Sequence, residues 1–142
     1  MSTIPRPDSE AAWVAWCHAG GFTQARTTVP DEHVDGMIRV SRVGGERQSK
    51  IHESVAMLFE VWHTSALEAA KLALRLNAHI ENVPNGTHLN ATTRVYGVEA
   101  TGPAEFPDDS SALVRYQFTA TCLARRVSAQ RTTGAQPEGS TP

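Results

Sequence analysis

A segment near the end of the chain alternates between apolar and polar side chains, and this alternation constrains the fold more than any other feature. Successive side chains of a β-strand point to opposite faces, so a period of two predicts a strand with one buried face. We therefore expect residues 113–125 to form a strand. The apolar positions are Val114, Tyr116, Phe118, Ala120 and Cys122, and they alternate with Arg115, Gln117, Thr119 and Thr121.

Three other segments have strand character. Residues 37–43 alternate from Ile38 onward, and residues 94–100 form another short apolar run. Residues 52–62 carry apolar side chains on both sides, which predicts a central strand that is covered on both faces or that faces a partner subunit. The polar residues 44–50 between two of these strands predict a long, mobile hairpin loop.

Two helices are predicted by their capping residues. Asp8 can accept hydrogen bonds from free backbone N–H groups, and Gly20-Gly21 permits the chain to turn away, so a helix is expected between them. Ser65 and Glu68 form a capping box at the start of a second helix that runs to about Asn82. The apolar stripe of the second helix is Ala69, Leu72, Ala73, Leu76 and Ile80.

Trp13 and Trp16 lie three residues apart and share a face of the first helix. They either pack in the core or form a partner-binding face.

These elements predict an α+β fold: a mostly antiparallel four-stranded sheet, a long helix packed on one face, and an N-terminal helix. Residues 1–126 would form a single domain, and the polar, aperiodic residues 127–142 a disordered C-terminal tail. The side chains expected to be largely buried are Val55, Phe59, Leu72, Leu76, Tyr96, Tyr116 and Phe118.

Composition narrows the class of protein. The chain has 142 residues, 13 Lys and Arg against 15 Asp and Glu, and a net charge of −2, with no cluster of basic residues along the sequence. These features disfavour a DNA-binding domain and a membrane-surface protein. No apolar segment resembles a membrane span or a signal peptide, so we expect synthesis in the cytosol, where Cys17 and Cys122 would be buried, reduced thiols.

The sequence contains no recognisable catalytic or metal-binding motif. The six histidines show no ligand spacing with one another or with a cysteine, so we expect no metal, no cofactor and no enzymatic activity. Asp108 and Asp109 are adjacent carboxylates, but an acid/base pair would need burial to separate the two pKa values, and a solvated loop is the expected setting.

A set of short motifs, in order along the chain, resembles the tail terminator (tail completion) proteins of long-tailed bacteriophages, particularly those of actinobacteria. The resemblance covers residues 11–125. Its motifs are Ala-Trp-Val-Ala-Trp at residues 12–16, Val29-Pro30, residues 38–45 with their Gly-Gly end, Leu58 to His63, Glu68-Ala69-Ala70, Tyr96-Gly97-Val98, Gly102-Pro103, Pro107-Asp108 and residues 115–119.

This resemblance implies a virion assembly role without catalysis. Such proteins form a hexameric ring on the head-proximal end of the tail tube, stop tube polymerisation and offer a surface for joining to the head. The implied partners are further copies of the chain, the major tail tube protein and a head completion or stopper protein, with genomic DNA only passing through the lumen and no membrane. The implied location is the virion, at the head-proximal end of the tail.

Subunit contacts are expected on the exposed sheet face and on the loop 102–109. Two alternatives remain: another phage neck component such as a head–tail stopper, and an unrelated small ligand-binding or enzymatic domain. The candidates for polar pairing across a subunit contact are Arg47, Lys50, Asp108, Asp109 and Arg115.

Overall fold

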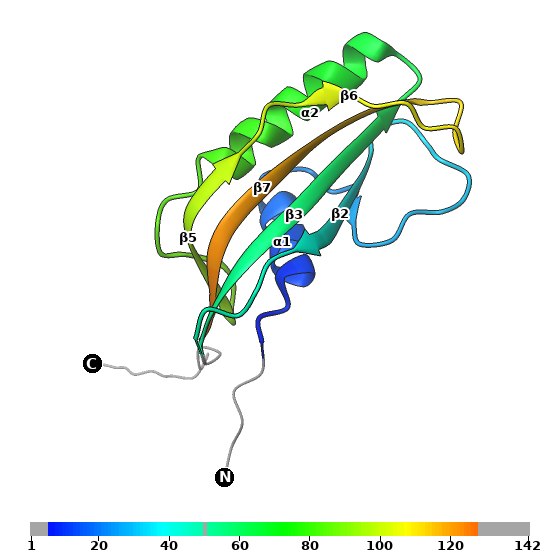
Figure 1. Ribbon diagram of the computed structural model, residues 1–142. Coiled ribbons are helices and arrows are strands. Elements are labelled where there is room, and N and C mark those ends of the chain that lie inside the picture. The colour runs from blue at the N-terminus through cyan, green and yellow to red at the C-terminus, as the bar shows by residue number, and fades with distance from the viewer. Residues whose placement is uncertain (1–5, 50, 128–142) are drawn as a thin grey trace.

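The computed structural model describes residues 6–49 and 51–127. In this part of the chain, seven strands form one strongly curled, half-barrel sheet, and both helices lie on the same face of it (Figure 1). In chain order the elements are α1 (Ser9–Ala19), β1 (Ala25–Arg26), β2 (Met37–Gly44), β3 (His52–His63), α2 (Ala66–Glu81), β4 (Thr87–Asn90), β5 (Thr93–Ala100), β6 (Ala104–Glu105) and β7 (Val114–Arg126).

The prediction of a four-stranded, mostly antiparallel sheet with a long helix is wrong. The strand order is β1-β2-β3-β7-β5-β4, with β6 also paired to β7, and β1 runs parallel to β2, so the sheet is mixed and the protein is mostly sheet. The three additional strands have only two, four and two residues. Strands this short cannot show the alternation on which a sequence prediction depends.

The sheet is built around the pairing of β3 with β7. Their register runs without interruption from His52 opposite Arg125 to His63 opposite Val114. The two predicted strands at these positions are confirmed, as are those in the β2 and β5 segments. Long twisted strands coil strongly, and register shifts in the β2–β3, β5–β7 and β4–β5 pairs add local bends, which together explain the curl.

The core fills the space between the sheet and the two helices. Phe59 of β3 stacks on Phe118 of β7 with ring centroids 5.0 Å apart, and Trp13 of α1 meets Phe59 edge-on at 6.0 Å. Val55, Phe59, Leu76 and Phe118 are buried as predicted, whereas Leu72, Tyr96 and Tyr116 are only half-buried. Cys17 and Cys122 are buried and free, as expected.

Both predicted helix starts are confirmed by their caps. The Asp8 carboxylate accepts a hydrogen bond from the Ala11 N–H, and the Ser65 hydroxyl accepts one from the Glu68 N–H.

Trp16 and His79 join the two helices. The indole N–H of Trp16 donates to the His79 carbonyl at 3.2 Å, and the Nε2 of His79 donates to the Trp16 carbonyl at 2.7 Å. Their rings also stack, with centroids 5.0 Å apart. Trp13 therefore packs in the core and Trp16 packs between the helices, in line with the core-packing hypothesis for this pair.

Glu53 of β3 is a buried carboxylate that is paired with arginines. Glu53 is 1% exposed, and it accepts a hydrogen bond from Arg42 at 2.8 Å and lies 3.3 Å from Arg6. Arg39 points to the opposite face of β2, where it approaches Glu60 at 3.9 Å. This arrangement agrees with the odd spacing of the two arginines on one strand.

Two side chains accept hydrogen bonds from backbone N–H groups at the margins of the sheet. The Glu10 carboxylate accepts the Arg42 N–H of β2 at 2.9 Å, on the side of β2 away from β3. The Asn85 side chain accepts the Gly97 N–H of β5 at 2.7 Å, beyond the end of β4. These N–H groups are therefore already satisfied within the chain.

The expectation of a disordered tail over residues 127–142 falls almost entirely outside the described residues. Val127 is described, and its N–H donates to the Thr92 carbonyl at 2.8 Å. The expected mobility of residues 44–50 also includes Lys50, which lies outside the described part.

Replacement of Gly20 by alanine is expected to loosen the contact between the helices. A Cβ at Gly20 would lie 2.5 Å from the His79 ring, so the ring must leave its stack on Trp16 and its hydrogen bond. We expect Gly20→Ala to lower the free energy of unfolding by about 1–3 kcal/mol, measured by denaturant titration. Gly102→Ala is the matched control, because a Cβ there meets nothing within 4 Å. Equal stability of the two variants would contradict this account.

Candidate functional site

The face of the sheet that is turned away from the helices is the candidate interaction surface, called the outer face below. Within the described residues it is formed mainly by alternate side chains of β2, β3, β7 and β5, and most of them are half-buried. Its two ends differ in chemistry. Ten residues along β3 separate Trp62 at one end from His52 at the other, which corresponds to about 33 Å at roughly 3.3 Å per residue.

Two loops meet around Trp62. The Trp62 ring is 2% exposed, and its indole N–H donates to the Asp108 carboxylate at 2.8 Å. The centroid of the His33 ring lies 4.8 Å from the centroid of the Trp62 ring. Trp62 therefore holds the segment before β2 and the segment before β7 against the same end of the sheet.

Beneath these loops, Glu60 is shared by two arginines. Glu60 is 5% exposed, and it accepts a hydrogen bond from Arg115 at 3.1 Å and approaches Arg39 at 3.9 Å. Arg115 also donates to the Pro107 carbonyl at 2.8 Å, which fixes the loop before β7. A cavity of about 380 Å³ lies here, lined by Val29, Pro30, Asp31, His33, Arg39, Glu60, Trp62, Asp108, Ser110 and Arg115.

The Asp108 carboxyl is held in its charged form. Its pKa is lowered from 3.8 to about 2, mainly because the Ser110 side chain donates a hydrogen bond to it and next because Trp62 does. Asp108 thus stays an anion over the whole physiological range.

The loops at the Trp62 end are acidic. They contain six carboxylates, and no Lys or Arg occurs in residues 27–38 or 95–114. Val34 and Phe106 are the exposed apolar side chains of these loops, at 49% and 43% exposure. The carboxylates are Asp31, Glu32, Asp35, Glu105, Asp108 and Asp109.

The other end of the outer face carries a row of basic side chains. His52 of β3 lies opposite Arg125 of β7, Arg125 lies opposite Arg94 of β5, and Arg94 lies opposite His88 of β4. Directly opposed residues in antiparallel strands project from the same face, so these four side chains form a line across four strands. We call it the cationic row, after Arg94 and Arg125.

The arginines of the cationic row lack acidic partners. Among the described residues, neither Arg94 nor Arg125 forms an ion pair, although Arg94 donates to the Gly86 carbonyl at 3.0 Å and lies over the Tyr96 ring. The buried Nε of Arg125 has no hydrogen-bond partner there. Like charges that face each other directly across a sheet are destabilising, so this arrangement favours an anionic partner from outside the subunit.

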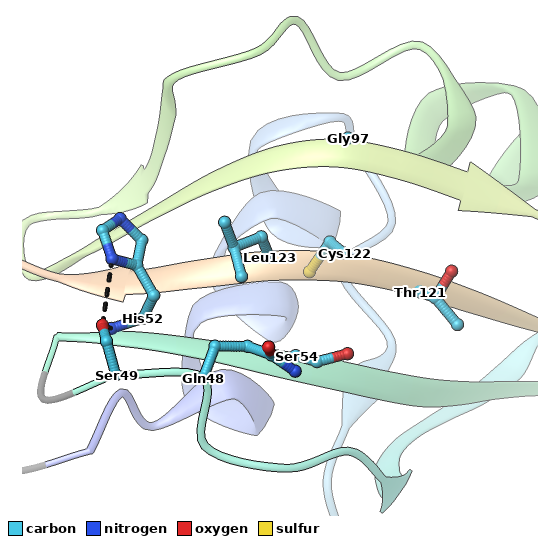
Figure 2. Close-up of a pocket in the computed structure, with 8 residues that line it drawn as sticks. All are labelled: Gln48, Ser49, His52, Ser54, Gly97, Thr121, Cys122 and Leu123. Atoms are coloured by element: carbon cyan, nitrogen blue, oxygen red, sulfur yellow. Dashed lines mark hydrogen bonds between the residues drawn. The ribbon is translucent and has the colours of Figure 1, made fainter.

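A hollow of about 480 Å³ adjoins the cationic row (Figure 2). It lies over β3 and β7, between the loop that precedes β3 and the bend of β5 at Gly97. The Ser49 hydroxyl and His52 Nδ1 are 3.3 Å apart at its edge. Its lining is Gln48, Ser49, His52, Ser54, Gly97, Thr121, Cys122 and Leu123.

The structure separates the predicted interface residues into two groups. Asp108 and Arg115 lie together at the Trp62 end, and the exposed Asp109 is beside them. Arg47 pairs with Glu53 in an isolated bridge at the opposite end, and its Nε donates to the Ser49 carbonyl at 2.9 Å. Lys50 is outside the described residues. Within one copy of the chain, Arg115 therefore lies near Asp108, whereas Arg47 is at the opposite end of the sheet from both.

Sequence reasoning missed Glu60 and Trp62 as site residues, and it missed the cationic row. Glu60 is the one charged residue within the apolar second half of β3, which is a signal that could have been used. The expectation that no basic residues cluster needs correction, because His52, His88, Arg94 and Arg125 come together only through strand register.

Other chemistry in the described residues is limited. They contain no group of three or more His, Cys, Asp or Glu side chains placed to hold a metal ion. Burial raises the pKa of both the Cys17 and Cys122 thiols to about 12. No helix in the described part of the chain is long and apolar enough to cross a membrane.

No protein-family model matches the sequence, and no curated protein matches it either.

Removal of either donor to Asp108 is expected to raise its pKa. The lowered pKa in the folded state means that the carboxylate stabilises the fold above the unfolded pKa near 4, and that this contribution is lost as the pH falls through about 2. Ser110→Ala should raise the pKa more than Trp62→Phe, because Ser110 is the larger cause. Carboxyl carbon NMR titration measures both.

Asp35 provides the internal control for this titration. Its pKa is lowered by hydrogen bonds from Thr64, which neither variant touches. If the pKa of Asp108 were the same in both variants as in the parent protein, the proposed hydrogen bonds would not be the cause.

Proposed function

We propose that this chain is a ring-forming virion assembly protein that caps the head-proximal end of a phage tail tube, stops tube polymerisation and provides the surface for head joining. The observation that carries the proposal is the outer face of the sheet. Both helices pack on the other face, so within the described residues no helix covers this long face. A half-buried face of this kind suits contact with another protein.

The sequence resemblance supports the same role. Several of the matching motifs lie on elements that shape the outer face. Residues 38–45 are mostly β2, Leu58 to His63 end β3, and residues 115–119 lie near the start of β7. Pro107-Asp108 lies in the acidic loop that Trp62 holds. The motifs at residues 12–16 and 68–70 lie instead on α1 and α2, on the other face of the sheet.

The proposed partners follow from this role. They are further copies of the chain in a hexameric ring, the major tail tube protein and a head completion or stopper protein, with genomic DNA passing through the lumen. The proposed location is the head-proximal end of the tail, and no catalytic step is part of the role.

One observation favours a second candidate, a small ligand-binding or enzymatic domain. The cavity at Trp62 brings Glu60, Arg39, Arg115, Asp108 and His33 together, and convergent titratable groups in a cavity are a feature of binding sites. However, Arg115 is bonded to Glu60, and Asp108 to Trp62, so these groups serve first to hold the loops.

The ring proposal predicts a defined assembly. Native mass spectrometry of concentrated purified protein should show a hexamer, and electron microscopy of the same sample should show rings with a central opening. Phe59→Ala, which removes the ring stacked on Phe118 in the core, is the control that should not assemble, since such a change costs about 3–5 kcal/mol.

Deletion of the gene from its phage separates the proposed function from the stopper alternative. A terminator role predicts unattached heads and tails of irregular or excessive length, and added purified protein should restore joining. Tails of normal length that carry a terminator ring but do not join heads would support a stopper. A phage that assembles normally without the gene would refute both.

A further inference from the structure

We infer that neighbouring copies of this chain dock head to tail, with the acidic loops at the Trp62 end of one copy seated on the cationic row at the His52 end of the next. This inference rests on the proposed ring-forming function and names the surfaces that close the ring. A heterologous contact between two different patches makes a ring when its rotation closes. The two ends of the outer face are such a pair of patches.

Charge complementarity is the first support. Asp31, Glu32, Glu105 and Asp109 form no ion pair among the described residues, just as Arg94 and Arg125 form none. The two sets lie about 33 Å apart along the strands, at roughly 3.3 Å per residue, so they cannot neutralise one another within a subunit. Contact between copies would pair both sets at once.

Shape complementarity is the second support. Phe106 follows β6 in the acidic loop and is 43% exposed, while its backbone N–H is anchored to the Arg115 carbonyl at 2.9 Å. The hollow beside the cationic row has a volume of about 480 Å³, and a cavity of about 150 Å³ already accepts a benzene ring. We assign Phe106 as the apolar anchor that enters this hollow. Aromatic side chains often serve as such anchors at protein interfaces.

A nucleic acid is the other anionic partner that a cationic row could bind. Two observations make it the weaker choice. The whole chain carries a net charge of −2, and only two arginines and two histidines form the row. Binding of DNA usually involves a larger basic surface, whereas an acidic surface of matching size is present on the chain itself.

Two charge-reversed variants test the contact. Arg94→Glu with Arg125→Glu reverses the row, and Glu105→Arg with Asp109→Arg reverses the acidic loops at exposed positions. Each variant alone should associate at least about 10-fold more weakly than the parent protein, because two patches of like charge would meet. In an equimolar mixture every contact between the two different variants joins opposite charges, so association should return to within about threefold of the parent value.

The measurement uses one variant immobilised on a sensor surface and the other in solution, so that a single contact is detected without a complete ring. Thermal melting confirms that each variant is folded. The milder pairs Arg94→Gln with Arg125→Gln and Glu105→Gln with Asp109→Asn should each weaken self-association. Binding should return when the two are mixed, because the unaltered acidic loops of the first still meet the unaltered cationic row of the second. These variants keep the test valid if reversal itself disturbs the fold.

Phe106→Ala tests the apolar anchor, and Leu74→Ala is its matched control. Leu74 is 59% exposed on α2, outside both ends of the outer face. We expect Phe106→Ala to weaken association at least about 10-fold and Leu74→Ala to leave it unchanged. Equal effects of the two substitutions would overturn the assignment of Phe106.

The outcomes separate this inference from the proposed function. If the parent protein forms rings and restores head joining, but the mixed reversed variants do not bind, the head-to-tail contact is wrong and the function stands. If the mixture binds but the parent protein neither forms rings nor restores joining, the contact stands and the function is wrong. Binding of a short DNA duplex through Arg94 and Arg125, without association of copies, would overturn the inference in favour of a nucleic acid.

Discussion

The pairing of β3 with β7 is the constraint on which the rest of the structure depends. Its register continues through all of β3, and the stack of Phe59 on Phe118 lies near its middle. One face of this pair forms the floor of the core beneath α1 and α2, and the other forms the centre of the outer face (Figure 1). Because the same two strands extend to both ends, they also set the distance between the acidic loops and the cationic row.

The sequence predicted the long elements and missed the short ones. Alternation from Val114 to Cys122 and the capping box at Ser65 are local signals, so these elements are found from neighbouring residues alone. β1 and β6 consist of two residues each and exist only because β2 and β7 lie beside them. The curl of the sheet and its mixed pairing depend on such contacts, and for this reason the fold class could not be predicted correctly.

The candidate site was predictable only in part. Asp108 and Arg115 were identified as candidates for polar pairing, because the charged residues of the loop 102–109 and of a half-buried strand are visible in the sequence. The hydrogen bond between Trp62 and Asp108 joins residues 46 positions apart, and His52 and Arg125 are farther apart still. The side chains of the cationic row become neighbours through the register of four strands, and no spacing in the sequence encodes that register.

The hydrogen bonds from Glu10 to β2 and from Asn85 to β5 have a consequence for solubility. Uncapped N–H groups along a sheet margin can recruit a strand from another molecule and so begin aggregation. Here the Glu10 carboxylate and the Asn85 amide oxygen each accept a hydrogen bond from one such N–H group, on opposite sides of the sheet. Growth by strand addition is thereby discouraged while the chain accumulates in the cell, and association is directed to side-chain surfaces, whose geometry can limit the number of copies.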